Sequence, residues 1–190
     1  MADDEARTGL IEMVVESVRV HMLSSQHVVI LKELERDRYL PIWIGPWEAN
    51  AIAMKLQGLS PERPLTHDLF ASTLDELGVS ISRVVIADLA DETYHARLLL
   101  EANGKSYEID SRPSDALALA VRAGVRIFAA PAVLERAGVE PEQAAEDLES
   151  TGETVAPADP RLEVFRDFVN SLNVDVEGEH REGPGPSESG

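Results

Sequence analysis

The first forty-five residues alternate apolar and polar positions in a way that predicts three β-strands. The Val-rich segment 12–23, the apolar run that starts at His27 and the segment "YLPIWIG" are separated by polar stretches typical of turns. After Gly45 the apolar residues recur at helical spacing, with Pro46 in the first turn and Gly58 as a stop. We therefore expect three strands followed by a short helix that begins at a proline.

A second helix is predicted after the loop "LSPERPL", and its boundaries are well marked. Thr66 is a suitable N-cap, Asp68 lies in the first turn, and Gly78 follows the last turn. Its apolar residues fall at helical spacing on one face: Leu69, Phe70, Leu74 and Leu77. The segment 66–77 is therefore expected to form an amphipathic helix.

The following segments return to the periodicity of strands. "VSISRVVIADL", "YHARLLLEA" and "KSYEID" are predicted strands, and Asn103-Gly104 between the last two is a strong hairpin signal. Another proline-led helix ends at Gly124, and a short strand and a helical turn complete the body near residue 138. Because both halves contain three strands and then such a helix, the sequence suggests an internal pseudo-repeat.

The composition changes after the body, which we place at residues 1–138. Residues 139–160 are acidic and poor in large apolar side chains, as expected of a solvated linker. Residues 161–174 have the apolar spacing of an amphipathic helix, and residues 175–190 are expected to be disordered.

Charge narrows the classes of function. The net charge is −18, and residues 141–190 contribute −10 of it, so the body is acidic as well. Strong non-specific binding of duplex nucleic acid is therefore not expected, although a local basic cleft is compatible with this charge. The chain has no cysteine, which removes disulfides, thiolate nucleophiles and Cys-ligated zinc. A secretory signal and an apolar run of membrane-spanning length are not found either, so we expect a cytoplasmic protein.

Polar side chains gather at three positions where a predicted loop enters a helix. Such helix starts present free N–H groups that suit phosphate or carboxylate. The three groups are Trp47 and Glu48; Arg63, Thr66, His67 and Asp68; and Asp110, Ser111, Arg112, Ser114 and Asp115.

A purely structural role suits the same residues. Glu48, Asp68 and Asp115 occupy first turns, where a negative charge complements the helix dipole. Serines such as those of the third group are ordinary N-caps, and Arg63 and Arg112 can pair with the aspartates for the sake of the fold alone. Each residue taken singly is therefore explained without chemistry.

Their combination favours a functional site. Arg-Pro occurs in both "ERPLTHD" and "SRPSD", and the rigid proline helps a guanidinium to hold an oxyanion in a fixed place. If the two corners meet, they form a site for phosphodiester cleavage in which Arg neutralises phosphate and His67 moves a proton. Glu48, Asp110 and Asp115 are hard oxygen ligands suited to Mg²⁺ or Mn²⁺.

Four blocks of sequence resemble the bifunctional nuclease domain family, small proteins of bacteria and plants. The blocks are "LPIWIGPWEANAI", "RPLTHDL", "VVIADLADETYHARLLL" and "IDSRPSDALALAVRAG", within residues 10–138. The resemblance implies a compact α+β domain with a mixed or antiparallel sheet flanked by several helices, a homo-oligomer, and nuclease activity on RNA and DNA. The positions that match the family pattern are Glu48, Arg63, Pro64, Thr66, His67, Asp68, Asp110, Arg112, Pro113, Ser114 and Asp115.

Our first hypothesis is a nuclease that acts on RNA, DNA or both, with single-stranded nucleic acid as its preferred partner and Mg²⁺ or Mn²⁺ as its cofactor if it uses one. In this hypothesis His67, Asp68, Asp110 and Asp115 are catalytic. The substrate-binding residues are Arg63, Arg112, Ser114 and Thr66, and the metal ligands are Glu48, Asp110 and Asp115.

Two other hypotheses stay open. The same corners can form a non-catalytic, regulatory module that binds a phosphorylated ligand or a protein partner, which the acidic body favours. Alternatively, they cap helices and hold a subunit interface of a dimer or larger homo-oligomer, with Arg112 buried against a partner's carboxylate.

Overall fold

The computed structural model describes residues 9–20, 26–141 and 154–157, and for the last of these only the backbone. All of them belong to one unit, Met1–Ala158. The predicted helix 161–174, the predicted tail 175–190 and most of the predicted linker lie outside the described residues. The proposed division of the chain therefore stays a prediction.

The first three predicted strands and the helix after them are confirmed. The strands β1, β2 and β3 pair in sequence as an antiparallel meander, and α2 begins directly at Pro46. The bounds are β1 (Ile11–Val20), β2 (His27–Glu33), β3 (Tyr39–Ile44) and α2 (Pro46–Leu56).

The second half repeats this order of elements. After α3 the chain forms a second antiparallel meander, β4 to β6, and then the proline-led helix α4. Asn103 and Gly104 have φ angles of 52° and 70°, as the tight turn between β5 and β6 requires. The bounds are α3 (Thr66–Glu76), β4 (Val79–Ala90), β5 (Thr93–Ala102), β6 (Lys105–Ser111) and α4 (Pro113–Ala123).

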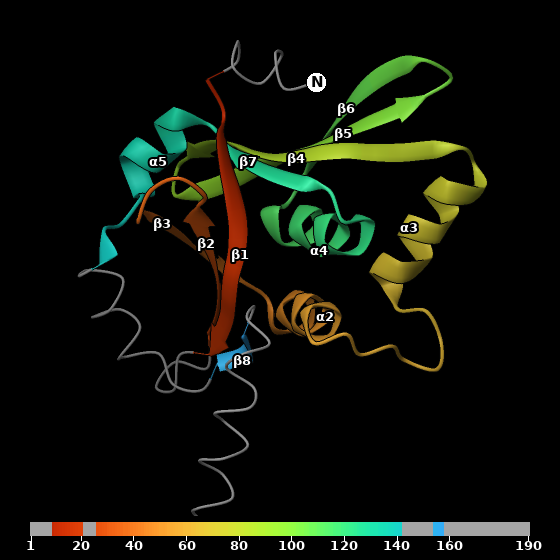
Figure 1. Ribbon diagram of the computed structural model, residues 1–190, viewed down its shortest axis with the longest axis horizontal. Helices are drawn as coiled ribbons and strands as arrows, with labels where there is room; N and C mark the ends of the chain where they lie inside the picture. The colour runs from red at the N-terminus through yellow and green to blue at the C-terminus, as the bar shows by residue number, and fades with distance from the viewer. Residues whose placement is uncertain (1–8, 21–25, 142–153, 158–190) are drawn as a thin grey trace, which may run out of the picture. The chain divides into compact units, whose positions relative to one another are not determined.

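A short strand, β7 (Arg126–Ala129), joins the two meanders into one mixed sheet (Figure 1). The strand order is β3-β2-β1-β7-β4-β5-β6, and β7 runs antiparallel to β1 but parallel to β4. The strand β8 (Thr154–Pro157) pairs with β1 as well, within the range predicted as a linker. The predicted α+β fold with a mixed sheet is therefore confirmed, and the sheet places one meander on each side of β7.

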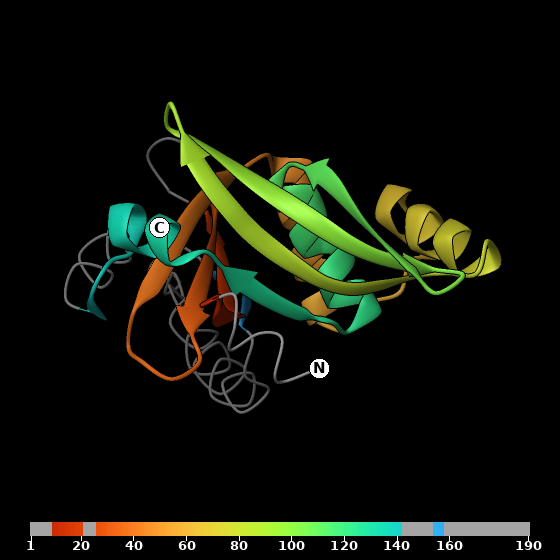
Figure 2. The same cartoon turned by 90° about the horizontal axis from the view of Figure 1, so that it is seen from above.

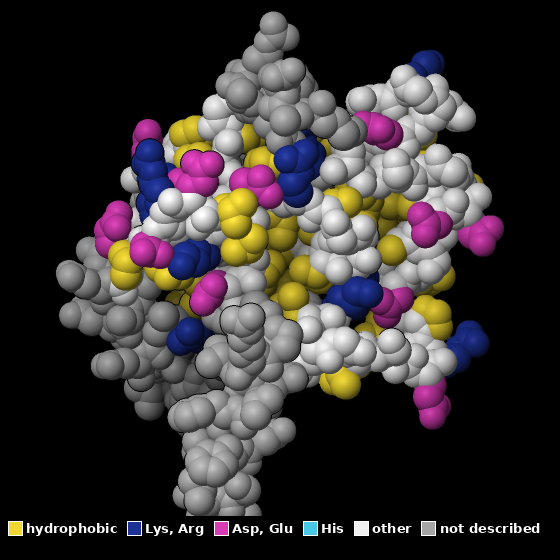
Figure 3. Space-filling view, viewed as in Figure 1, with side chains coloured by type: hydrophobic (Ala, Val, Ile, Leu, Met, Phe, Trp, Pro, Cys, Tyr) yellow, Lys and Arg dark blue, Asp and Glu magenta, His cyan; other side chains and the backbone are white. Residues whose placement is uncertain are grey.

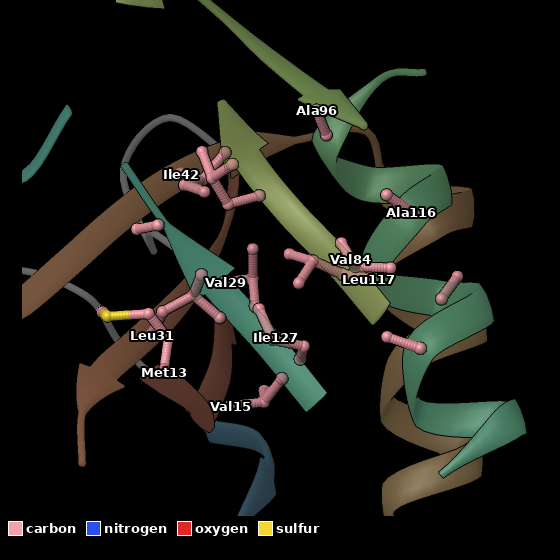
Figure 4. Close-up of a cluster of buried hydrophobic side chains, with 14 of the residues drawn as sticks. Met13, Val15, Val29, Leu31, Ile42, Val84, Ala96, Ala116, Leu117 and Ile127 are labelled. Atoms are coloured by element: carbon pink, nitrogen blue, oxygen red, sulfur yellow. The ribbon is translucent and has the colours of Figure 1, made fainter. Parts of the chain in front are cut away.

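Helix α4 lies in the centre of the domain. Figures 1 and 2 show it under the sheet, where it packs against β4, β5 and β7, and it also packs against α2 and α3. Leu117 is fully buried beside Val84 and Ile127 (Figure 4). Small residues on the same helix let the sheet and the neighbouring helices approach closely: Ala116, Ala118 and Ala120. Helix α4 is therefore buried on most sides, because the sheet, α2 and α3 cover it.

Helix α3 differs from its prediction in two ways. Its N-cap is Leu65, and Thr66 is the first helical residue, because the Asp68 carboxylate accepts the Leu65 backbone N–H at 2.9 Å and caps the helix from within. The predicted apolar face is also largely in solvent, with Leu69 61% and Leu77 70% exposed. The boundaries of the helix were thus predicted correctly, but its cap and its burial were not.

The remaining helix, α5 (Pro131–Ala137), packs against β4 and β3. None of the helices in the described part of the chain has both the length and the apolar character needed to cross a membrane.

Candidate functional site

The first turns of α2, α3 and α4 bring four charged or titratable side chains together. Glu48 comes from α2, His67 from α3 and Asp115 from α4, while Arg112 is the residue immediately before α4. Hydrogen bonds link all four, and we call them the Arg112 cluster. The two Arg-Pro corners therefore meet, a point that the sequence left open, and only the second contributes its arginine.

Arg112 is the centre of the cluster. It holds Asp115 with two hydrogen bonds, from Nε to Oδ2 at 2.7 Å and from Nη2 to Oδ1 at 3.0 Å. Its Nη2 also donates to Glu48 Oε1 at 2.8 Å. The Arg112 side chain remains 66% exposed, whereas Glu48 is 16% exposed, so the guanidinium faces solvent from a fixed position.

His67 completes the cluster through Asp115. Its Nε2 lies 3.1 Å from Asp115 Oδ1, and its side chain is mostly buried. An ionised carboxylate can only accept a hydrogen bond, so the Nε2 atom carries the hydrogen when the imidazole is neutral. The Nδ1 atom of His67 is then the ring atom that is able to take a proton.

The electrostatics of the cluster favour the ionised form of the Asp115 carboxylate. Partial burial acts to raise the pKa of Asp115, but hydrogen bonds from Arg112 and His67 outweigh it and hold this pKa below its ordinary value. The hydrogen bonds that Arg112 makes with Asp115, and then with Glu48, raise the pKa of the guanidinium. Asp115 is therefore a permanent acceptor that fixes the His67 ring.

Gly45, the N-cap residue of α2, makes room for Glu48. The Glu48 carboxylate folds back over this glycine, and a Cβ at position 45 would lie 2.4 Å from Glu48 Oε2. The backbone of Gly45 is extended, at φ −70° and ψ 156°, so its conformation alone does not call for glycine. The absence of a side chain at this position is what lets Glu48 reach Arg112.

Asp68 belongs to a separate, structural network. It accepts from Arg122 Nε at 2.6 Å, and Arg122 Nη1 donates to the carbonyl oxygens of Ala51 and Ala118 at 3.1 and 2.9 Å. Arg122 is almost fully buried and ties α2, α3 and α4 together. Burial acts to raise the pKa of Asp68, but the bonds from Leu65 and Arg122 hold it below its ordinary value. Arg122 was not predicted as part of any site, because its only signal in the sequence is that of a basic residue in the last turn of a helix.

Asp110 is not part of the Arg112 cluster. In β6 it stands opposite Arg97 of β5, with which it forms an ion pair, and Arg97 also binds Glu108. Its neighbour Ile109 stands opposite the buried Leu98, on the face that α4 covers. Since successive side chains of a strand point to opposite faces, Asp110 lies on the other face of the sheet.

The other predicted site residues make no side-chain hydrogen bonds to the cluster. Arg63 is exposed in the loop before α3 and has no ion-pair or hydrogen-bond partner among the described residues. Thr66 is exposed at the start of α3, and Ser114 is buried in the first turn of α4. Neither Ser111 nor Ser114 caps α4, so the predicted serine cap was wrong. The Ser111 hydroxyl is buried and has no hydrogen-bond partner in the described part of the chain.

The predicted set of metal ligands is not assembled. Glu48 and Asp115 both face Arg112, whose cationic guanidinium lies between them, and Asp110 is on the opposite face of the sheet. Across the residues that the structure describes, no group of three or more His, Asp or Glu side chains is placed to hold a metal ion. The side chains of the cluster therefore do not fit the Mg²⁺ or Mn²⁺ site that the sequence suggested.

Comparison with known proteins places this site in a family. The sequence matches the family described as "Bifunctional nuclease domain" over residues 29–142, a range that contains the whole Arg112 cluster. Two proteins of Mycobacterium tuberculosis are similar: "Uncharacterized protein MT1877" of strain CDC 1551 / Oshkosh and "Uncharacterized protein Rv1829" of strain ATCC 25618 / H37Rv. Each is 41% identical over 165 residues, which cover 86% of this chain and 96% of the relative. The chain therefore belongs to the bifunctional nuclease domain family.

Proposed function

We propose that this protein is a nuclease that cleaves phosphodiester bonds in RNA, DNA or both at the Arg112 cluster. The observation that carries the proposal is the chain of contacts from His67 to Asp115 to the exposed Arg112, in a member of this family. Such a chain supplies a proton acceptor, a group that orients it and a cation that faces solvent.

His67 acts as the proton-transfer group. Its Nδ1 takes a proton from the attacking oxygen, which belongs to water or to a ribose 2′-hydroxyl, as this oxygen bonds to phosphorus. The bond from phosphorus to the leaving oxygen breaks, and the leaving oxygen takes a proton from water. Asp115 holds the ring in place and stabilises the imidazolium that forms, as the carboxylate of a catalytic triad does.

Arg112 binds the phosphate in this scheme. Its Nε and Nη2 are held by carboxylates, while Nη1 takes part in none of the hydrogen bonds of the cluster and remains available to an oxyanion. Arg63 and Thr66, just before and at the start of α3, are proposed to contact the neighbouring phosphate or sugar. Assistance by Mg²⁺ or Mn²⁺ stays a prediction, and cleavage assays with and without each ion test it.

One observation favours the alternative of a non-catalytic module that binds a phosphorylated ligand. Two carboxylates already neutralise Arg112, and the chain as a whole has a charge of −18. We therefore expect the protein to bind a polyanion weakly. The alternative predicts that a small phosphorylated ligand raises the unfolding temperature while no nucleic acid is cleaved. The subunit-interface hypothesis, in contrast, is not needed to explain Arg112, since both of its carboxylates come from its own chain.

Two matched aspartate variants test the proposal. Asp115→Asn and Asp110→Asn remove the same charge, one inside the Arg112 cluster and one on the other face of the sheet. We expect cleavage of single-stranded RNA or DNA to fall by about 10² or more in Asp115→Asn, because the imidazole loses its orienting partner. Asp110→Asn is expected to cleave like the parent. Equal rates in the two variants would contradict the assignment.

A further inference from the structure

A cavity of about 440 Å³ adjoins the Arg112 cluster. Its walls come from the start of β2, the end of β3, the turn between β4 and β5, and the first turn of α4. This volume lies within the range of about 300 to 1,000 Å³ that is usual for small-molecule sites.

The cavity and the cluster share residues. Arg112 lines the cavity and also holds Asp115 and Glu48, and Gly45, which gives Glu48 its room, is another wall residue. A polymer whose phosphate lies at Arg112 therefore has an adjacent hollow into which the next group of the chain can fold.

The chemistry of the walls suits a planar heterocycle. Trp43 is one of the wall residues and is 52% exposed, which is unusual for so large an apolar side chain. The alternation along β3 explains it, because Ile42 is buried in the core and the next side chain points to the other face. Thr93 and Glu92 add polar atoms of the kind that bind the edge of a base.

The charge of the protein favours the same ligand. Binding through many phosphates needs a broad basic surface, whereas in Figure 3 the Lys and Arg side chains of the described residues stand singly among Asp and Glu on the face shown. A single-stranded chain can instead be held by stacking one base on an aromatic side chain beside a single arginine.

We infer that this cavity binds one nucleobase of the substrate, stacked on Trp43, with the adjoining phosphate at Arg112. This inference rests on the proposed function and gives it a substrate class, a single-stranded nucleic acid of which one unpaired base enters the cavity. The polar walls give the base its orientation, and Trp43 supplies most of the affinity.

The protein contains two tryptophans, Trp43 and Trp47, which permits a direct binding test. In Trp47→Phe the fluorescence reports only on Trp43, and in Trp43→Phe it reports only on Trp47, which is 82% exposed and outside the cavity. Each variant is titrated with adenosine and uridine 5′-monophosphates, and with ribose 5-phosphate, which lacks a base.

We expect a saturable change of fluorescence with either nucleotide in Trp47→Phe, none in Trp43→Phe, and none with ribose 5-phosphate in either. By calorimetry, the affinity of Trp43→Ala for the nucleotides should be about tenfold weaker than that of the parent. An equal response to ribose 5-phosphate, or the absence of both heat and fluorescence change with nucleotides, would overturn the inference.

The outcome can be separated from that of the nuclease proposal. Nucleotide titration of the parent measures the cavity alone, because His67, the proposed proton-transfer group, does not line it. If the parent binds nucleotides but cleaves no nucleic acid, the nuclease proposal is refuted and the base-binding cavity stands. If the parent cleaves nucleic acid but binds no nucleotide, the nuclease proposal stands and the base-binding cavity is refuted.

Discussion

At the scale of single residues, the Arg112 cluster depends on the spacing of Arg112 and Asp115 and on the absence of a side chain at Gly45. Arg112 reaches two carboxylates only because Asp115 is three residues further along the chain and Glu48 folds back over a glycine. Because hydrogen bonds hold these three side chains to one another, we expect the loss of one to change the position of the others.

Replacing Gly45 by alanine tests whether Glu48 needs the space that a Cβ at this position would fill. The added Cβ would displace the Glu48 carboxylate, so we expect Arg112 to lose one partner, cleavage to fall about tenfold and stability to fall by about 1 kcal/mol. Steady-state cleavage and urea unfolding measure the two effects. In a Glu48→Ala background the same replacement should have almost no further effect, and additive losses would show that Gly45 acts by another route.

The pKa of Asp115 predicts how stability depends on pH. This pKa lies below its ordinary value in the folded protein, so the unfolded chain binds the proton first, at about pH 4, and stabilisation by the charged form is lost as pH falls through the folded pKa. The parent should therefore be more stable than Asp115→Asn at pH 7, and the difference should shrink below about pH 4. Urea unfolding at pH 3 to 7 measures it, and a difference that is constant over this range would disprove the linkage.

At the scale of elements, short sequence patterns correctly predicted the features that depend on the backbone preferences of neighbouring residues. The Asn103-Gly104 hairpin and the proline-led starts of α2 and α4 depend on the backbone preferences of a few residues, and all three are as predicted. The position of β7 between the two meanders and the exposure of α3 depend on contacts between distant segments, which one sequence does not encode in any short pattern.

The residues of the candidate site likewise fall into those that a short sequence pattern predicted and those that depend on the tertiary fold. That His67 and Asp115 meet follows from two similar helix starts packed side by side, and the repeated Arg-Pro corner was a usable signal. Asp110 was assigned to the site because it is close in sequence, but strand alternation sends it to the other face. The arginine that holds Asp68 comes from the far end of α4, and no spacing in the sequence predicted it.

The different burial of α3 and α4 leads to a prediction about stability. Leu117→Ala leaves a cavity in the centre of the domain, so we expect a loss of about 2 to 5 kcal/mol in the free energy of unfolding. Leu69→Ala changes a side chain that is mostly in solvent, and a loss below about 0.5 kcal/mol is expected. Urea unfolding of both variants measures the difference, and similar losses would mean that α3 is covered in solution.

At the scale of the whole molecule, the net charge limits how the proposed nucleic-acid substrate can be held. The chain is strongly acidic, and the proposed phosphate contacts are limited to Arg112 and Arg63. The exposed apolar face of α3 is compatible with the predicted homo-oligomer, which stays a prediction that light scattering can measure.

The small number of phosphate contacts predicts a weak dependence on salt. For a single strand, each contact contributes about −0.7 to the slope of log affinity against log salt, so two contacts give roughly −1.4. Titration of a labelled oligonucleotide between 50 and 300 mM NaCl, over which the Debye length falls from about 14 to about 6 Å, measures the slope. A slope steeper than about −4 would show a basic surface that this account does not contain.

The most direct test of the account is the cleavage of single-stranded RNA and DNA by nuclease-cleared protein and by His67→Ala, with free imidazole added to both. His95→Ala, on the outer side of β5, is the matched control. We predict that His67→Ala loses about 10² or more of the rate, that imidazole restores part of it, and that the control keeps the parental rate. Cleavage that is the same in parent and His67→Ala would contradict the proposal that this cluster is the active site.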